Sequence, residues 1–240
     1  MASENVVYLL NLGSSMRDSA KIFEEQSLDG SELPKTKIGA VLDVLKLYIC
    51  FCMESRKRDE FCFCFGGVNI DGDDMINELS KESRVFSRPA KTLLQYLEKV
   101  QTYCQDSSRS SSCSNFDILG DTIAALGYLT ARNKSKKNTL KKIVIITDGI
   151  GTVDQDFSSS TNTITEKIAE LDCALEICLI EPGLSLTDSC IGTRKFIQGL
   201  SSVKSEVKSE ASGGDTSAGT HETVISRLMI LNKLNTKVST

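Results

Sequence analysis

Two short apolar segments, each followed at once by a polar loop, constrain the fold of this chain most strongly. Residues 6–10 and 143–146 are continuous runs of Val, Ile, Leu and Tyr, without the alternation of a half-exposed strand. Such runs are typical of strands that are buried on both faces of a parallel sheet. The loops that follow, residues 11–15 and 147–149, carry Asn, Ser, Thr and Asp. Because the carboxyl ends of parallel strands form the ligand crevice of open α/β sheets, we expect the two loops to converge on one point.

Amphipathic helices are expected to alternate with the strands. Apolar residues recur at helical spacing over residues 38–53, 93–104, 119–129 and 164–171. Two further, largely apolar runs at residues 60–65 and 173–180 favour additional strands. The alternation predicts an α/β fold: a doubly wound, mostly parallel, Rossmann-like sheet flanked by helices, with right-handed crossovers.

Local signals give the expected limits of several elements. Pro34 suits the first turn of the first long helix, and Asp117 is placed to cap the helix that follows it. Thr163 and Glu166 have the spacing of a capping box, which predicts that the next helix begins there. The acidic stretch over residues 68–82 is expected to be a loop.

Length and composition favour a single domain over residues 1–240. A disordered loop is expected inside it at residues 201–222, where Ser, Gly, Lys, Glu and Thr replace apolar residues. The nine cysteines come without a recognisable secretory signal, so we expect free thiols in a reducing compartment. The net charge of −4 argues against a surface built throughout for nucleic acid.

The sequence offers little for catalysis. No glycine-rich phosphate-binding motif follows a strand. The one histidine, His221, lies in the polar tail, which removes most mechanisms that need a histidine base. Asp117 and Asp148 are the only carboxylates that can be placed together, and a remnant of a metal site explains this pair better than catalysis does. We therefore expect no enzymatic activity and no cofactor.

Four cysteines raise the alternative of a zinc site: Cys50, Cys52, Cys62 and Cys64. Residues two apart on a helix point to different sides, so Cys50 and Cys52 should not face one metal ion. Cysteine pairs that bind zinc usually have about two to four residues between them, unlike Cys62 and Cys64. We therefore expect these cysteines to act as small buried hydrophobic residues.

The two polar loops resemble those of the von Willebrand factor type A family. In that family a metal-ion-dependent adhesion site uses an Asp-x-Ser-x-Ser motif after the first strand, a Thr from a middle loop and an Asp after a later strand. Here Asn11 stands at the first Asp, Gly13 at the first Ser, and Ser15 at the second Ser. The family's middle-loop Thr corresponds to a position near Asp117 in this chain, and Asp148 stands at the position of the later Asp.

These replacements weaken a magnesium site. Mg²⁺ prefers hard oxygen ligands in near-octahedral geometry. Asn11 removes a formal charge, Gly13 removes an oxygen atom, and Asp117 would place a carboxylate where a hydroxyl belongs. The resemblance therefore implies a type A fold with a degenerate site that holds no metal.

Within this family the chain is most similar to the amino-terminal domain of the larger subunit of the Ku heterodimer. Three motifs carry the likeness: residues 11–16 close to the start, residues 116–121 before a helix, and residues 145–148 before an acidic loop. The first strand begins at Asn5 without an acidic leader, which favours the larger subunit over the smaller one. The resemblance implies a non-catalytic nuclear domain that acts in non-homologous end joining and telomere maintenance.

The resemblance also implies partners. The smaller Ku subunit would complete a heterodimer, and DNA ends would bind through the full-length complex, with little contact from this domain and none with a membrane. Repair or telomere proteins would dock on the outward face of a helix through Thr165, Glu166, Lys167 and Glu170. An ordinary solvated helix face is the alternative for these positions.

A basic cluster precedes the second of the two apolar strands. Its members are Arg132, Lys134, Lys136, Lys137, Lys141 and Lys142. Cations stabilise the carboxyl end of a helix, which is one interpretation of the cluster. A minor phosphate contact through Lys136 and Lys137 is the other.

Two other functions stay open at this point. The chain could be a type A scaffold subunit of another intracellular complex, such as a proteasomal ubiquitin receptor or a transcription and repair factor. It could also be a Mg²⁺-dependent ligand-binding domain, which a magnesium-specific thermal shift would reveal.

Overall fold

The structure is a computed structural model, and seven parts of the chain are described. These are residues 3–18, 36–69, 74–106, 116–133, 139–151 and 157–180, together with Phe196. The expected loop over residues 201–222 lies outside them, as do Pro34, Lys134, Lys136, Lys137 and His221.

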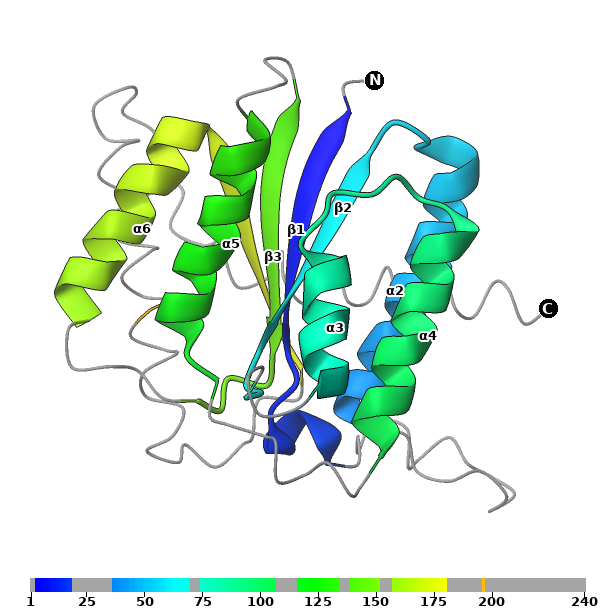
Figure 1. The fold of residues 1–240 in the computed structure, drawn as a ribbon. Coiled ribbons are helices and arrows are strands. Elements are labelled where there is room, and N and C mark those ends of the chain that lie inside the picture. Colours follow the sequence, from blue (N-terminus) through cyan, green and yellow to red (C-terminus); the bar gives the residue numbers. More distant parts are fainter. Residues whose placement is uncertain are drawn as a thin grey trace, which may run out of the picture.

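Four parallel strands form one sheet in the order β2-β1-β3-β4 (Figure 1). The strands are β1 (Glu4–Asn11), β2 (Glu60–Gly66), β3 (Leu140–Thr147) and β4 (Cys173–Leu179). The register between β1 and β3 places Leu10 opposite Ile146, so both strands end at the same edge of the sheet. The predicted α/β fold with a parallel sheet is confirmed.

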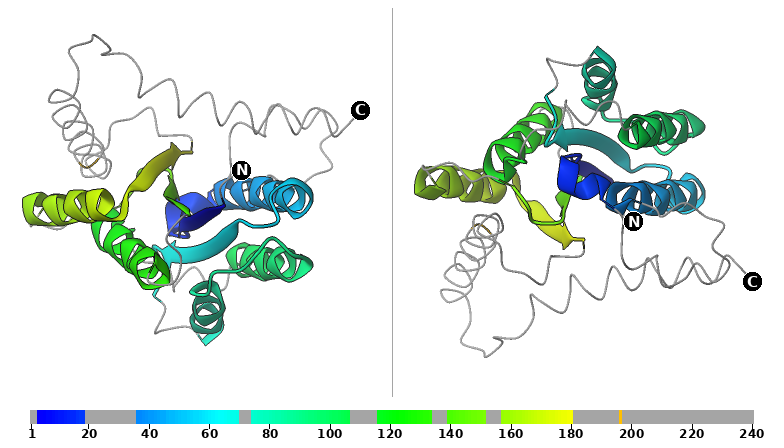
Figure 2. Two further views of the ribbon diagram at one scale, coloured as in Figure 1. Left: turned by 90° about the horizontal axis from the view of Figure 1, so that it is seen from above. Right: turned by 90° about the horizontal axis from the view of Figure 1, so that it is seen from below.

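Helices cover both faces of this sheet (Figure 2). They are the 3₁₀ helix η1 (Ser14–Arg17) and the α-helices α2 (Lys37–Ser55), α3 (Asp74–Ser83), α4 (Lys91–Gln105), α5 (Ile118–Asn133) and α6 (Phe157–Leu171). Side chains of β1 alternate between the two faces. Val6, Tyr8 and Leu10 pack with α2, α3 and α4, whereas Val7 and Leu9 pack with α5 and α6. Burial on both faces explains why β1 is apolar from Val6 to Leu10.

Two local predictions were wrong. Residues 74–83, part of the expected acidic loop, form α3, because Ile76 and Leu79 lie at helical spacing and are buried. Helix α6 begins at Phe157, well before the expected capping box. Thr163 therefore lies inside the helix, and its hydroxyl donates a hydrogen bond to the carbonyl of Ser159 at 3.0 Å.

The first long helix begins at Lys37, with Thr36 as its cap. The Thr36 hydroxyl accepts a hydrogen bond from the Gly39 amide at 3.1 Å. The carbonyl of Asp18 accepts a hydrogen bond from the Lys37 amide at 3.0 Å, which ties the start of α2 to the end of η1. The beginning of α2 is thus held beside the loop that follows β1.

Candidate functional site

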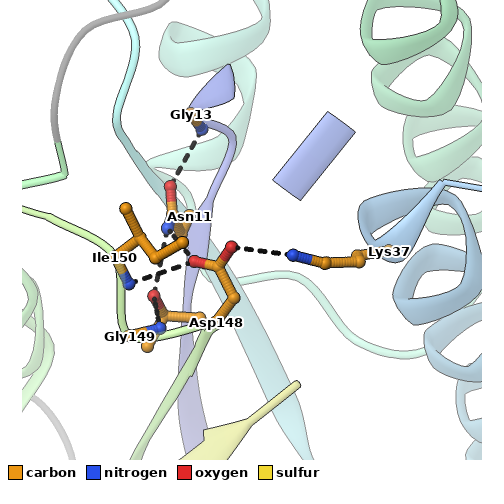
Figure 3. A network of polar contacts seen from close by, with 7 residues as sticks. Asn11, Gly13, Lys37, Asp148, Gly149 and Ile150 are labelled. Atoms are coloured by element: carbon orange, nitrogen blue, oxygen red, sulfur yellow. Dashed lines mark hydrogen bonds and ion pairs between the residues drawn. The ribbon is translucent and has the colours of Figure 1, made fainter. Parts of the chain in front are cut away.

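The two polar loops meet, as the sequence predicted. The side-chain amide of Asn11 donates to the hydroxyl of Thr147 at 3.0 Å, and it lies 3.5 Å from Oδ1 of Asp148 (Figure 3). All three residues are buried. The carboxyl ends of β1 and β3 therefore form one closed polar cluster at the edge where α/β sheets usually bind ligands.

The amide of Asn11 is held in one orientation. Its oxygen accepts a hydrogen bond from the Gly13 amide at 2.9 Å, so its nitrogen faces Thr147 and Asp148. An amide nitrogen carries no lone pair for a cation. Asn11 therefore works as a donor that ties the two loops together.

Lys37 supplies a positive charge to this cluster. Its ammonium lies 3.2 Å from Oδ2 of Asp148, and only 12% of its side chain is exposed, whereas that of Asp148 is fully buried. Figure 3 shows Lys37 reaching from the start of α2 toward the carboxylate. The second oxygen of Asp148 accepts a hydrogen bond from the Ile150 amide at 3.2 Å. A buried carboxylate needs this compensation, because an unpaired charge in the interior is strongly destabilising.

These residues do not fit a magnesium ion. Both oxygens of Asp148 already have donors, the oxygen of Asn11 is bound to Gly13, and Gly13 has no side chain. The ammonium of Lys37 already neutralises the charge of Asp148, as a bound metal ion would. Within the parts of the chain that the structure describes, no group of three or more His, Cys, Asp and Glu side chains could hold a metal ion.

Two other positions of the family's motif play local roles. Ser15 lies half-buried in η1. Asp117 caps α5, as predicted, because its carboxylate accepts a hydrogen bond from the Leu119 amide at 3.2 Å. Among the described residues, no hydrogen bond joins Asp117 to Asn11 or Asp148. Asp117, which the sequence placed in this cluster, thus caps its own helix.

Asp121 carries a half-buried carboxyl group that the sequence did not single out. Burial raises its pKa to about 7, with a further contribution from the charge of Asp117. Its Oδ2 atom packs against Gly66 so closely that a β-carbon added there would lie only 2.1 Å away. The one-turn spacing of Asp117 and Asp121 was the available signal, since it places both acids on one side of the helix.

Three of the four cysteines are buried hydrophobic residues, as predicted, whereas the prediction was wrong for Cys50. Cys52 packs in the core under α2, whereas Cys62 and Cys64 pack on the opposite face of the sheet, and Cys50 is exposed. A hydrogen bond with Cys62 and burial hold the pKa of the Cys64 thiol well above its ordinary value. The Cys64 thiol is therefore a poor nucleophile.

The described members of the basic cluster have internal partners. Arg132 pairs with Glu60 at 2.6 Å, Lys142 pairs with Glu176 at 2.8 Å, and Lys141 donates to the carbonyl of Leu171. The charges of Arg132 and Lys142 are thus compensated inside the domain, whereas Lys141 binds a neutral carbonyl at the end of α6. The predicted phosphate contact falls on Lys136 and Lys137, outside the described residues.

The predicted docking positions all lie on α6. Glu166 and Glu170 are exposed, whereas Thr165 and Lys167 are half-buried. The Thr165 hydroxyl donates to the carbonyl of Thr161 at 2.9 Å, so its hydrogen is used within the helix. The two glutamates are therefore the accessible part of this surface.

Comparisons with known proteins leave the family open. No family model matches the chain, and no curated protein matches it. In the described part of the chain, no helix has both the length and the apolar character needed to cross a bilayer. The likeness to type A domains therefore depends on the short motifs around Asn11 and Asp148.

Proposed function

We propose that this chain is a non-catalytic protein-interaction domain of a DNA-end-binding Ku heterodimer. It would act in double-strand break repair by non-homologous end joining and in telomere maintenance, in the nucleus. The observation that carries this proposal is the ion pair of Lys37 with Asp148, which closes the crevice of a type A-like sheet. A domain whose crevice is filled from within interacts through its outer surfaces.

We place the binding surfaces on the outside of the domain, because Lys37 occupies the crevice. A type A domain that binds ligands through a metal needs a carboxylate with free oxygen atoms. Both oxygen atoms of Asp148 already have donors, which are Lys37 and the Ile150 amide. Glu166 and Glu170 give α6 an exposed acidic face. We assign this face to repair or telomere proteins, and we assign DNA ends to the full-length heterodimer with the smaller Ku subunit.

The test is assembly with the smaller Ku subunit. The full-length protein that contains this chain is co-expressed with the smaller Ku subunit of the same organism, and the complex is isolated by size-exclusion chromatography. The proposal predicts a heterodimer that binds linear DNA and ignores closed circular DNA of the same sequence. Absence of a heterodimer, or equal binding to both DNA forms, would contradict it.

A further inference from the structure

A hollow lies away from the crevice, between α3 and α5 and against β1 and β2. Its volume is about 110 Å³, and it is partly open to solvent. It is lined by Leu9, Cys64, Phe65, Ser80, Arg84, Asp121, Ala124 and Tyr128. Both the Lys37–Asp148 pair and the exposed face of α6 lie outside this lining.

The exposed surface of the lining is mostly apolar, and polar atoms are added by Ser80, Arg84, Asp121 and Tyr128. Leu9, Phe65 and Ala124 contribute apolar atoms, and Ala124 is exposed at the opening. An apolar cavity of about 150 Å³ takes a benzene molecule, so a somewhat smaller one accommodates a branched aliphatic group. Burial of such a group strengthens binding about tenfold or more.

A basic segment runs from the hollow toward the amino end of β2. Arg84 lines the hollow and is itself exposed, and the segment that it begins, residues 84–91, carries two more exposed cations and no acid. Those cations are Arg88 and Lys91. This local excess of positive charge contrasts with the net charge of −4 of the whole chain.

The basic segment is held in place against the sheet. Ser87 and Phe61 exchange two backbone hydrogen bonds, of 2.8 and 2.9 Å, in an antiparallel bridge. Val85 is 62% exposed between the two arginines, so the surface offers apolar as well as charged contacts. The combination is typical of a protein-binding surface, since phosphate groups alone would leave Val85 and the hollow without a partner.

We propose that this hollow receives one aliphatic side chain of an extended acidic peptide from a partner protein, with carboxylates of the peptide paired to Arg84 and Arg88. Guanidinium groups bind carboxylates through two parallel hydrogen bonds, which fixes the orientation of the peptide. The inference goes beyond the proposed function, because it uses a surface remote from α6 and requires neither DNA nor the smaller Ku subunit.

The experiment uses a displayed library of random linear peptides, selected against the intact chain. We expect the selected peptides to combine acidic residues with an aliphatic residue. Their affinity should fall about tenfold or more when Ala124→Phe fills the hollow. Ala131→Phe, a change at an exposed position on the same helix, is the matched control and should leave the affinity unchanged.

A second variant tests the charges without touching the packing. The double substitution Arg84→Glu and Arg88→Glu should abolish binding of the selected peptides, whereas the matched double substitution Lys57→Glu and Arg58→Glu, at exposed positions between α2 and β2, should not. The proposal is overturned if no peptides are selected, if they lack the acidic and aliphatic pattern, or if they bind the Ala124→Phe variant as well as the parent. It is equally overturned if Arg84 and Arg88 prove to bind a DNA duplex instead.

Discussion

The ammonium of Lys37 lies 3.2 Å from the buried carboxylate of Asp148, at the point where two parallel strands end. The pair joins the start of α2 to the end of β3, which are remote in sequence and adjacent in the fold. The ammonium of Lys37 therefore stands in the crevice in place of a bound metal ion. The following predictions test this relationship and the surfaces around it.

Removal of the Lys37 charge should destabilise the domain. In Lys37→Met the carboxylate of Asp148 stays buried without its cation, which costs about 3 kcal/mol of the free energy of unfolding. The double variant Lys37→Met with Asp148→Asn should recover most of this loss, because an amide oxygen can still accept from Ile150. Urea unfolding measures both effects.

A more exposed lysine provides the control for this substitution. Lys46 pairs with Asp43 at 3.0 Å, and 23% and 33% of the two side chains are exposed. Solvent screens such a pair, so Lys46→Met should change stability by less than about 1 kcal/mol. Equal losses in the Lys37 and Lys46 variants would contradict a special role for Lys37.

Asp121 should make stability fall as pH rises toward neutrality. Its pKa is about 7 in the folded domain against an ordinary value of 3.8, so between these pH values the folded state holds a proton that the unfolded state releases. The free energy of unfolding therefore decreases from about pH 4 to about pH 7, by at most about 4 kcal/mol. Above pH 7 this contribution is constant.

Substitution at this position isolates the effect. Asp121→Asn should flatten the pH dependence between pH 4 and pH 7 and raise the melting temperature at pH 8. Glu98→Gln, at an exposed position of α4, should leave the slope as it is. An unchanged slope in Asp121→Asn would show that another group titrates.

Gly67 should be intolerant of a side chain. Its φ of +74° is left-handed, and a β-carbon there would lie 2.7 Å from both Oδ1 of Asn11 and the Gly13 nitrogen. Gly67→Ala should therefore cost about 2 kcal/mol or more, since it adds strain and disrupts the Asn11 to Gly13 hydrogen bond. Gly127→Ala, in open space on α5, should be neutral or stabilising by about 0.5–1 kcal/mol. Thermal unfolding of the two variants checks this contrast.

The acidic face of α6 should bind a partner without supporting the fold. Glu166→Lys with Glu170→Lys should remove a repair or telomere protein that co-purifies with the heterodimer, while the melting temperature stays within about a degree, because surface changes are nearly neutral. Glu54→Lys with Glu98→Lys, at exposed positions of α2 and α4, is the matched control. Loss of the fold in the α6 variant would remove the docking assignment.

Much of the fold could be predicted because burial leaves a clear pattern in the sequence. Strands β1 and β3 carry unbroken apolar runs at residues 6–10 and 143–146, since helices cover both faces of the sheet there. Parallel pairing then brings Asn11 and Asp148 to one edge. Helix α3 was missed because its acidic composition hid the spacing of Ile76 and Leu79. Composition reports average polarity, whereas a helix needs only one apolar stripe.

The central contact of the site could not be predicted. Lys37 opens a helix whose start the sequence placed near Pro34, and no motif marks a lysine that reaches toward a distant carboxylate. Asp117 was expected to join Asp148 in one site, and its carboxylate accepts a hydrogen bond from the Leu119 amide at the start of α5. Local patterns identified both acids, and only the packing of α2 and α5 against the sheet decided their partners.

Magnesium dependence of thermal unfolding tests the central claim most directly. The melting temperature of the chain is measured in magnesium chloride and in a chelator, with sodium chloride matching the ionic strength. Because Lys37 already neutralises Asp148, we expect the two melting temperatures to agree. A saturable, magnesium-specific increase of several degrees would show that the crevice still binds the metal, and it would contradict the account.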